Sequence, residues 1–250
     1  MPPRYEVIGV EGLPEIGAGE ALSNLIARAA AAQGTPLAAA DLLVISQKIV
    51  SKAEGRIVRL IEITPSPETV AMAEELGRDA RLIEVILRES RRVVRRDKGV
   101  LIVETHQGWI CANAGVDQSN VDADTACLLP EDSDRSAREL RDGLRALTGH
   151  DLGIIIADTF GRPWREGLTN VAIGVAGLEP LKSYLGEKDP AGHVLQATIL
   201  ALADELASAA EPIMGKLDRI PVVIIRGLDW PRGETGSRAL IRDPARDLFR

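Results

Sequence analysis

Three short apolar runs recur along this chain, at 41–45, 152–157 and 222–225. Runs of this length that are rich in Val, Ile and Leu are typical of buried β-strands, and they are far below the ~18 residues that a membrane-spanning helix needs. Helical patterns lie between the runs, but strands and helices do not alternate strictly. This order favours an α+β fold with mixed sheets, or an irregular α/β fold, over a regular doubly wound sheet.

The remaining patterns predict where the other elements lie. A strand is expected at 5–10 and a β-hairpin at 100–113, and the polar, basic segment 46–56 is expected to be a loop. Helices are expected at 20–32, 78–89, 134–147 and 194–214, with another beginning at Ser66. Because no low-complexity linker or internal repeat divides the chain, residues 1–250 are expected to form one domain, with two subdomains as an alternative.

Composition and charge restrict the classes of partner. Hydrophobic residues make up 45% of the 250 residues, enough for a substantial core, and the net charge is −7. A negative chain has no overall electrostatic attraction to nucleic acid or to an anionic membrane, so we expect small-molecule partners, no nucleic acid and no membrane. The N-terminus lacks a secretory signal pattern, which predicts a cytoplasmic protein. Cys111 and Cys127 are expected to be reduced, buried thiols.

Several common active-site signatures are missing from the sequence. It contains no G-x-x-x-x-G-K-[ST] loop, no G-x-G-x-x-G fingerprint, no H-E-x-x-H and no C-x-x-C pair. The three histidines, at 106, 150 and 193, are far apart and have no cysteines at ligand spacing, which argues against a structural zinc site. A surface or hairpin position explains each histidine as well as a catalytic role does.

Two aspartates occupy turn-like surroundings that suit a hard cation. Asp117 lies in the glycine-containing segment 113–120, and Asp158 follows the apolar run 152–157 and precedes Thr159. Mg²⁺ and Mn²⁺ prefer oxygen ligands, commonly one or two carboxylates together with substrate phosphates. A purely structural role is the alternative, in which Asp117 forms an Asx-turn and Asp158 caps the segment that follows.

Basic side chains near these positions are candidates for binding phosphate. Lys48 and Lys52 lie in the expected loop, and Arg162 and Arg165 follow the second aspartate. Their ammonium and guanidinium groups could neutralise phosphate oxygens. The alternative is that these side chains lie in solvated loops and bind no ligand. The basic run 91–98 is better explained as an exposed charged face than as a ligand site.

Six segments carry a resemblance to a known family. They are GLPE at 12–15, SKAEGR at 51–56, NAGVDQSN at 113–120, ADTFGRPWREG at 157–167, AIGVAG at 172–177 and IPVVIIRG at 220–227. Their order and spacing resemble those of the coenzyme F-420-0:L-glutamate ligases, the gamma-glutamyl ligase family, over nearly the whole chain. One such segment alone would be weak evidence for the family, whereas six segments in the same order and spacing make the chain similar to this family throughout.

This resemblance implies a ligase of coenzyme F-420 biosynthesis. GTP would phosphorylate the terminal carboxylate of F-420-0, and the amine of L-glutamate would attack the acyl phosphate to give an amide, GDP and phosphate. Two divalent cations, Mg²⁺ or Mn²⁺, would assist, with K⁺ as an additional candidate and no flavin. The implied fold is gamma-glutamyl ligase-like, with two subunits intertwined as a homodimer. We expect no fused C-terminal flavin-dependent domain of the kind that some family members carry.

The resemblance also assigns roles to individual residues. Asp117 and Asp158 should act in catalysis and hold the first cation, and Thr159 should help to hold the second. Nucleotide contacts should come from Gly12, Leu13, Pro14, Glu15, Gln47, Lys48, Lys52 and Asn120. The turn after the last long helix departs from the family, because Lys216 stands where an acidic or amide ligand is common. Asp218, or the substrate phosphates, would then complete the second site.

Two other functions stay open on the sequence. A metal-dependent phosphotransferase or phosphohydrolase would use a similar set of aspartates and basic residues without an amino-acid acceptor. A non-catalytic nucleotide-binding module would result if Lys216 had abolished the second cation site. Glutamate-dependent release of phosphate separates the first alternative from the ligase, and nucleotide binding without turnover identifies the second.

Overall fold

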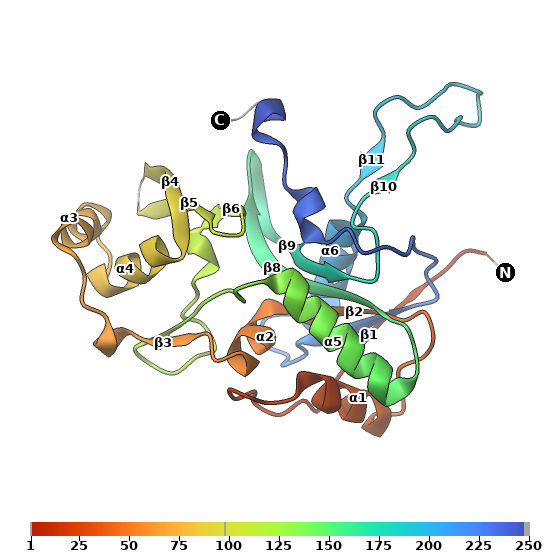
Figure 1. Ribbon diagram of the computed structural model, residues 1–250, viewed down its shortest axis with the longest axis horizontal. Coiled ribbons are helices and arrows are strands. Elements are labelled where there is room, and N and C mark those ends of the chain that lie inside the picture. The colour runs from red at the N-terminus through yellow and green to blue at the C-terminus, as the bar shows by residue number, and fades with distance from the viewer. Residues whose placement is uncertain (1, 98, 248–250) are drawn as a thin grey trace.

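The computed structural model describes residues 2–97 and 99–247, and its largest element is a five-stranded mixed sheet. The strands follow the order β1, β12, β2, β8 and β9 across the sheet (Figure 1). They are β1 (Glu6–Gly9), β2 (Leu42–Ser46), β8 (Gly153–Arg162), β9 (Arg165–Ala176) and β12 (Val222–Arg226). The β2–β8 pair is parallel, and the other three pairs are antiparallel. The expected α+β class with mixed sheets is confirmed.

Helices cover both faces of this sheet (Figure 1). They are α1 (Leu22–Ala32) and α5 (Ser133–Thr148) on one face and α6 (Leu202–Met214) on the other. Successive side chains of a strand point to opposite faces, so Leu43 and Ile45 pack with α1 and α5, whereas Leu42 and Val44 pack with α6. Burial on both faces explains the unbroken apolar runs of the sequence, and all three expected strands are confirmed.

Other expected elements are also present. The strand expected at 5–10 corresponds to β1, and the helices expected at 20–32 and 134–147 correspond to α1 and α5. The helix expected to begin at Ser66 is α3 (Pro67–Leu76), and the Ser66 side chain accepts a hydrogen bond from the backbone N of Thr69 at 3.2 Å. These are the positions where sequence periodicity and capping signals agree with the packing.

The polar segment after β2 forms a short helix, α2 (Gln47–Ala53), so the loop expected at 46–56 is wrong. Ile49 is buried on the core side of this helix, and tertiary packing of this kind stabilises short helices that propensity alone does not. Lys48 and Lys52 are one helical turn apart and therefore share a face. The helix begins directly after β2, so both lysines lie at the carboxyl end of a central strand.

A third hydrophobic cluster takes its buried residues from the segment 60–128. The elements of this region, besides α3, are β3 (Ile57–Arg59), α4 (Ala80–Arg88), β4 (Ser90–Asp97), β5 (Val100–Thr105), β6 (Ile110–Ala112) and β7 (Thr125–Cys127). Strands β4, β5 and β6 form one small sheet, and β3 pairs with β7. Ile83 and Ile86 of α4 are fully buried in this cluster beside Leu101 and Val103 of β5. The helix and the hairpin predicted here are confirmed.

The basic run 91–98 belongs mostly to strand β4, and position 98 lies outside the described residues. Arg91 and Arg92 both form ion pairs with Glu104 on the neighbouring strand β5, at 3.2 and 2.8 Å. Most side chains of β4 are exposed. The run is therefore an exposed charged face, as expected, and this face belongs to an edge strand.

A long arm leaves the main sheet between β9 and α6 (Figure 1). Its base is held by the antiparallel pair β10 (Lys182–Ser183) and β11 (Ile199–Leu200). The helix expected over 194–214 is therefore wrong in its first part, because α6 begins only at Leu202. The preceding residues form the returning side of the arm, where no core surface is available to stabilise a helix.

Strand β8 is longer than the strand expected at 152–157. It continues into a hairpin with β9, in which Asp158 pairs with Val171 and Thr159 pairs with Asn170. A register shift between positions 156 and 157 locally disturbs the pairing. Asp158 thus lies within a strand, and the expectation that it occupies a turn after the strand, or caps the following segment, is wrong.

Short 3-10 helices also occur, η1 (Leu60–Glu62), η2 (Asn113–Gly115), η3 (Ser237–Leu240) and η4 (Pro244–Arg246). Over residues 2–97 and 99–247, no helix has both the length and the apolar character needed to cross a membrane. Cys111 and Cys127 are free thiols and are buried, as expected.

Candidate functional site

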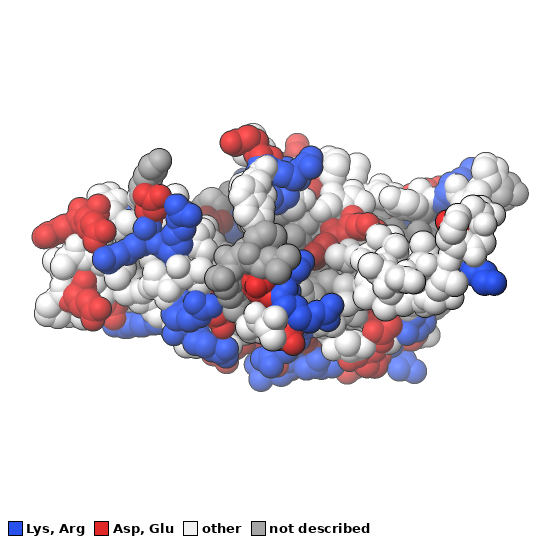
Figure 2. Space-filling model, turned by 90° about the horizontal axis from the view of Figure 1, so that it is seen from above, with Lys and Arg blue, Asp and Glu red and all other residues white. Residues whose placement is uncertain are grey.

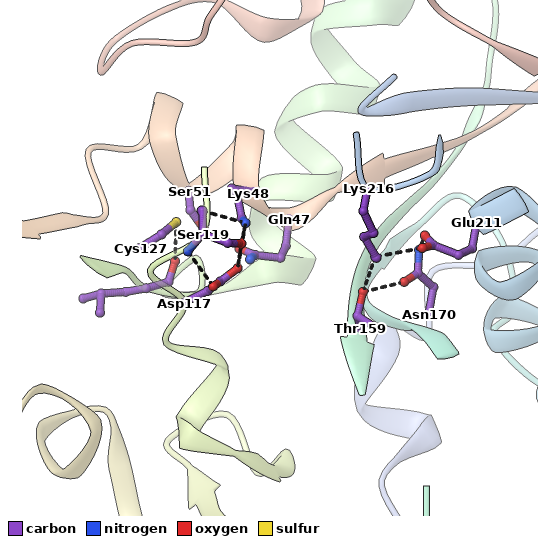
Figure 3. A network of polar contacts seen from close by, with 11 residues as sticks. Gln47, Lys48, Ser51, Asp117, Ser119, Cys127, Thr159, Asn170, Glu211 and Lys216 are labelled. Carbon is purple, nitrogen blue, oxygen red and sulfur yellow. Dashed lines mark hydrogen bonds and ion pairs between the residues drawn. The ribbon is translucent and has the colours of Figure 1, made fainter. Parts of the chain in front are cut away.

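Lys48 of α2 meets an aspartate and a serine from a distant segment of the chain, Asp117 and Ser119 (Figure 3). Lys48 Nζ lies 2.6 Å from Asp117 Oδ2, and it donates to the backbone oxygen of Ser119 at 2.9 Å and to Ser119 Oγ at 2.7 Å. Ser119 donates to Asp117 from its backbone N to Oδ1 at 2.8 Å and from Oγ to Oδ2 at 2.7 Å. These contacts orient the Asp117 carboxylate. Lys48, Asp117 and Ser119 are called the first cluster below.

The backbone around Asp117 is fixed independently of its side chain. Asp117 N donates to the backbone oxygen of Cys127 at 3.0 Å, and Cys127 N donates to the backbone oxygen of Asp117 at 2.8 Å. Gly115 has a φ of +69°, and a Cβ at this position would lie 2.7 Å from the Leu129 side chain, so only glycine fits. The bond from Ser119 N to Asp117 is the expected Asx-turn. The structural role of Asp117 therefore exists together with its contact to Lys48.

Asp158 lies on β8, close enough to the first cluster for the charges of Asp117 and Lys48 to shift the pKa of Asp158. Loss of hydration on burial raises the pKa of Asp158 from 3.8 to about 6, and the charge of Asp117 adds to this effect. A backbone hydrogen bond at Thr159 and the charges of Lys48 and Lys216 oppose the rise only in part. Burial also disfavours the charge of Asp117, but the hydrogen bonds from Lys48 and Ser119 hold the pKa of Asp117 below its usual value, so Asp158 is the carboxylate whose charge is not compensated.

A second polar cluster begins one residue further along β8 (Figure 3). Thr159 Oγ1 donates to Asn170 Oδ1 at 2.7 Å, and Asn170 Nδ2 donates to Glu211 Oε2 at 2.7 Å. Lys216 Nζ donates to Thr159 Oγ1 at 2.8 Å and forms an ion pair with Glu211 Oε1 at 2.8 Å. These four side chains, the second cluster, form a closed ring contributed by β8, β9, α6 and the turn after α6.

The two regions differ in their fit to a cation. Asp117 and Asp158 bring two carboxylates to the neighbourhood of one ammonium group, so a divalent cation there would relieve their repulsion. In the second cluster one carboxylate already meets one ammonium group, and that ammonium contacts the Thr159 hydroxyl. The residues present therefore fit the first expected cation, and they do not fit a second cation bound to Thr159.

The expected nucleotide-binding residues come together around α2. Lys52 forms an ion pair with Glu15, which brings the 12–15 loop against this helix. Leu13 packs against the main core from the same loop. The Gln47 side chain is buried at the start of α2, and its Oε1 accepts a hydrogen bond from Ser51 Oγ at 2.9 Å. The loop and the helix thus form one contiguous structure beside the first cluster.

Other predicted residues have different surroundings. Gly12 has a φ of +75° and Asn120 a φ of +55°, so both have a left-handed backbone, and Asn120 follows Ser119 directly in a turn. Asp218 is exposed in the turn after α6, and its carboxylate folds back over that turn's own glycine. Arg162 donates to the backbone oxygens of Glu166 and Gly167 at the start of β9, at 2.5 and 3.4 Å, and thereby supports the hairpin. Arg165 is exposed beside the β8–β9 turn.

Sequence reasoning did not nominate Ser119, Asn170 or Glu211. Ser119 lies within a segment that carried the family resemblance, so its position could have suggested it. Asn170 is identified only by its pairing with Thr159, and Glu211 only by the packing of α6 on β9. Within the described part of the chain, no three His, Cys, Asp or Glu side chains converge on one point. A cation bound here would therefore take further ligands from substrate or water.

Comparison with known proteins gives a consistent result. Residues 12–227 match the model of the family described as F420-0:Gamma-glutamyl ligase. A protein of Methanothermobacter thermautotrophicus is 47% identical over 247 residues, covering 98% of both chains. One of Methanopyrus kandleri is 48% identical, covering 93% of this chain and 92% of its own. One of Methanocaldococcus jannaschii is 42% identical, covering 99% and 97%. All three are named Coenzyme F420:L-glutamate ligase.

Proposed function

The chain belongs to the F420-0:Gamma-glutamyl ligase family, and on that premise we propose how it works as a coenzyme F420:L-glutamate ligase. It joins the amine of L-glutamate to the terminal carboxylate of coenzyme F420-0, in a reaction driven by GTP. The substrates are small and water-soluble, and the reaction takes place in the cytoplasm.

The chemistry requires the carboxylate to be activated before the amide forms. An oxygen of the F420-0 carboxylate attacks the γ-phosphorus of GTP, the bond to the β-phosphate oxygen breaks, and GDP leaves. The glutamate amine then attacks the carbonyl carbon of the acyl phosphate, inorganic phosphate leaves, and the ammonium nitrogen loses a proton. Positioning and charge neutralisation are the main demands of phosphoryl transfer, so a set of carboxylates and lysines without a nucleophile triad suits it.

The observation that carries the proposal is the Lys48–Asp117 ion pair at the carboxyl end of β2, with Asp158 on the neighbouring strand β8 close enough for both charges to shift its pKa. A Mg²⁺ or Mn²⁺ ion held by the two aspartates would supply charge for the nucleotide phosphates. Lys48 binds a phosphate oxygen when its partner Asp117 is engaged elsewhere. Asp158 is well suited to a cation because burial makes its own negative charge unfavourable without one.

The nucleotide lies along α2 and the 12–15 loop in this proposal. Gly12, Leu13, Pro14 and Glu15 line it from the loop, and Gln47, Lys48 and Lys52 line it from the helix. Asn120 approaches from the loop that follows Ser119. The ion pair between Lys52 and Glu15 supports this assignment, because it links the two nucleotide-binding segments before any ligand is present.

We also propose that the protein is a homodimer that uses the arm. The arm projects from the main sheet (Figure 1) and carries Leu185, Val194, Ile199 and Leu200, which are 37–51% exposed. Figure 2 shows wide uncharged areas on the half of the molecule that bears the arm, whereas charges of both signs crowd the half that bears α3 and α4. An exposed set of apolar side chains on a projection is typical of an interface, and an exchanged arm would intertwine the subunits.

Phosphate release tests the ligase against the other two functions. Purified protein with GTP and Mn²⁺ should release phosphate continuously only when F420-0 and L-glutamate are both present. Release with F420-0 but without glutamate, beyond one equivalent per chain, would indicate a phosphohydrolase. Binding of GTP without release under any condition would indicate a nucleotide-binding module.

A further inference from the structure

Lys216 closes a ring of polar contacts that would otherwise present oxygen atoms without a positive charge. Its ammonium nitrogen is 2.8 Å from both the Thr159 hydroxyl and a Glu211 carboxylate oxygen. The Thr159 hydroxyl donates onward to Asn170, so the oxygen that faces Lys216 acts as an acceptor. The oxygen atoms of a hydroxyl, an amide and a carboxylate are the ligands that a hard cation prefers. Here the ammonium group of Lys216 occupies the position that such a cation would take.

The backbone explains how Lys216 reaches this position. Helix α6 ends at Met214, and Gly215 follows with a φ of +54° and a ψ of −171°. This conformation is strained for residues with a Cβ atom, and it turns the chain so that Lys216 folds back toward the β8–β9 hairpin. The side chain of Glu211, one turn before the helix end, is 27% exposed and points to the same place.

The second cluster differs in net charge from the pair of aspartates, Asp117 and Asp158. Glu211 and Lys216 neutralise each other, and Thr159 and Asn170 are uncharged, so the second cluster holds no surplus negative charge. A divalent cation bound to the Thr159 hydroxyl would stand next to the ammonium group, which lies 2.8 Å from that oxygen. Two positive charges that contact the same oxygen atom lie only a few ångströms apart and repel each other, even at a protein surface. A second cation therefore requires Lys216 to leave.

We propose that the ammonium group of Lys216 takes the place of a second divalent cation, so that each chain binds one divalent cation and contacts the nucleotide phosphates directly through Lys216. This inference rests on the proposed function, because it takes a phosphate-bearing nucleotide as the ligand. Two of the three N–H donors of Lys216 are used within the second cluster, and a phosphate oxygen is the partner for the third. The Lys216 side chain is 60% exposed, which leaves its ammonium group accessible to a ligand.

Counting bound Mn²⁺ tests this inference without measuring activity. Equilibrium dialysis in the presence of a non-hydrolysable GTP analogue should give one Mn²⁺ per chain for the wild type and two for Lys216→Gln, which replaces the ammonium with a ligand oxygen. Lys216→Arg keeps the charge and should stay at one. Lys188→Gln, an equal loss of charge at an exposed position on the arm, should also stay at one.

The outcomes separate this inference from the proposed function. Two ions in the wild type, or one ion in Lys216→Gln, would overturn the role of Lys216 while leaving the ligase proposal intact. No bound ion in the wild type would overturn both, because the Asp117–Asp158 site would then fail as well. Affinity for the analogue in the absence of Mn²⁺ should fall about tenfold or more in Lys216→Gln, since a charge-assisted hydrogen bond to phosphate is lost. An unchanged affinity would contradict the direct contact.

Discussion

Lys48 and Asp117 are 69 positions apart in the sequence, yet their side chains meet at 2.6 Å. The contact joins the first turn of α2 to the loop before β7. Ser119 stabilises it by accepting hydrogen bonds from Lys48 and by donating one to Asp117. It keeps both charges satisfied when no ligand is present. A cation at Asp117 and a phosphate at Lys48 would replace this single ion pair by two, and in the proposed function the resting contact would hold both groups ready for these ligands.

Replacing Lys48 by Gln should weaken nucleotide binding more than stability. The Asp117 side chain is 41% exposed, so water screens the loss of its partner, and we expect the free energy of unfolding to fall by only about 1 kcal/mol. Affinity for GDP in the presence of Mn²⁺ should fall at least about tenfold, because the phosphate loses a charge-assisted hydrogen bond. Titration calorimetry measures this, with Lys188→Gln as the control. Equal affinities of Lys48→Gln and wild type would contradict the assignment.

Asp158→Asn should separate stability from activity. Burial raises the pKa of Asp158 to about 6, so near neutral pH the charged carboxylate lowers the stability of the cation-free folded protein. The amide removes this charge, and with a chelator present the variant should be equally stable or more stable, by on the order of 1 kcal/mol. Its ligase rate should nevertheless fall at least about 100-fold if a cation is lost. A large loss of stability would instead show that Asp158 is mainly structural.

Asp204 offers a test of pH dependence away from the site. Its carboxylate in α6 accepts a hydrogen bond from Ala172 N at 2.9 Å, and burial raises its pKa above the ordinary value of 3.8. The folded state therefore binds the proton more tightly than the unfolded state. The stability that this supplies is complete below 3.8 and is lost as pH rises through the folded-state pKa.

Asp204→Asn should remove this dependence while keeping an acceptor for Ala172 N. The free energy of unfolding of the variant should rise relative to that of the wild type between about pH 4 and about pH 7. Urea denaturation at both pH values measures the difference. A relative stability that is constant, or that moves in the opposite direction, would contradict the raised pKa.

The arm provides a test of the oligomeric state. We expect Leu185→Arg combined with Val194→Arg to convert a dimer into monomers, because two buried apolar contacts would be replaced by desolvated charges. Leu147→Arg is the matched control, since Leu147 is 50% exposed on α5 and Leu185 is 49% exposed on the arm. Analytical ultracentrifugation measures the mass. A wild-type protein that sediments as a monomer would rule out the proposed homodimer.

Periodicity and apolar runs predicted the core well. The run 152–157 reads as a buried strand because Ile154 and Ile156 pack on one face of the sheet while Ile155 packs on the other. An unbroken apolar run therefore predicts burial on both faces of the sheet from the sequence alone. The run does not reveal where β8 ends, because the extension past Asp158 depends on pairing with β9 and not on apolar character.

The site was predictable only where its residues are adjacent in sequence or share a family pattern. Asp117, Asp158, Lys48 and Thr159 were nominated in this way; the structure places Lys48 and Asp117 in the first cluster, Thr159 in the second, and Asp158 beside Thr159 on β8. Glu211 reaches Asn170 across 41 positions, and no local pattern encodes that contact. Lys216 could be recognised as a departure from the family, but its contact with Thr159 follows from the turn that ends α6.

Mass spectrometry of the product is the most direct test of the ligase activity and of its aspartates. Wild-type protein incubated with F420-0, L-glutamate, GTP and Mn²⁺ should convert F420-0 into a species heavier by one or more glutamyl residues. The Asp117→Asn, Asp158→Asn double variant should leave F420-0 unchanged. Unmodified F420-0 with the wild type, while GTP still binds, would contradict the ligase assignment, and equal conversion by the double variant would contradict the role of the two aspartates.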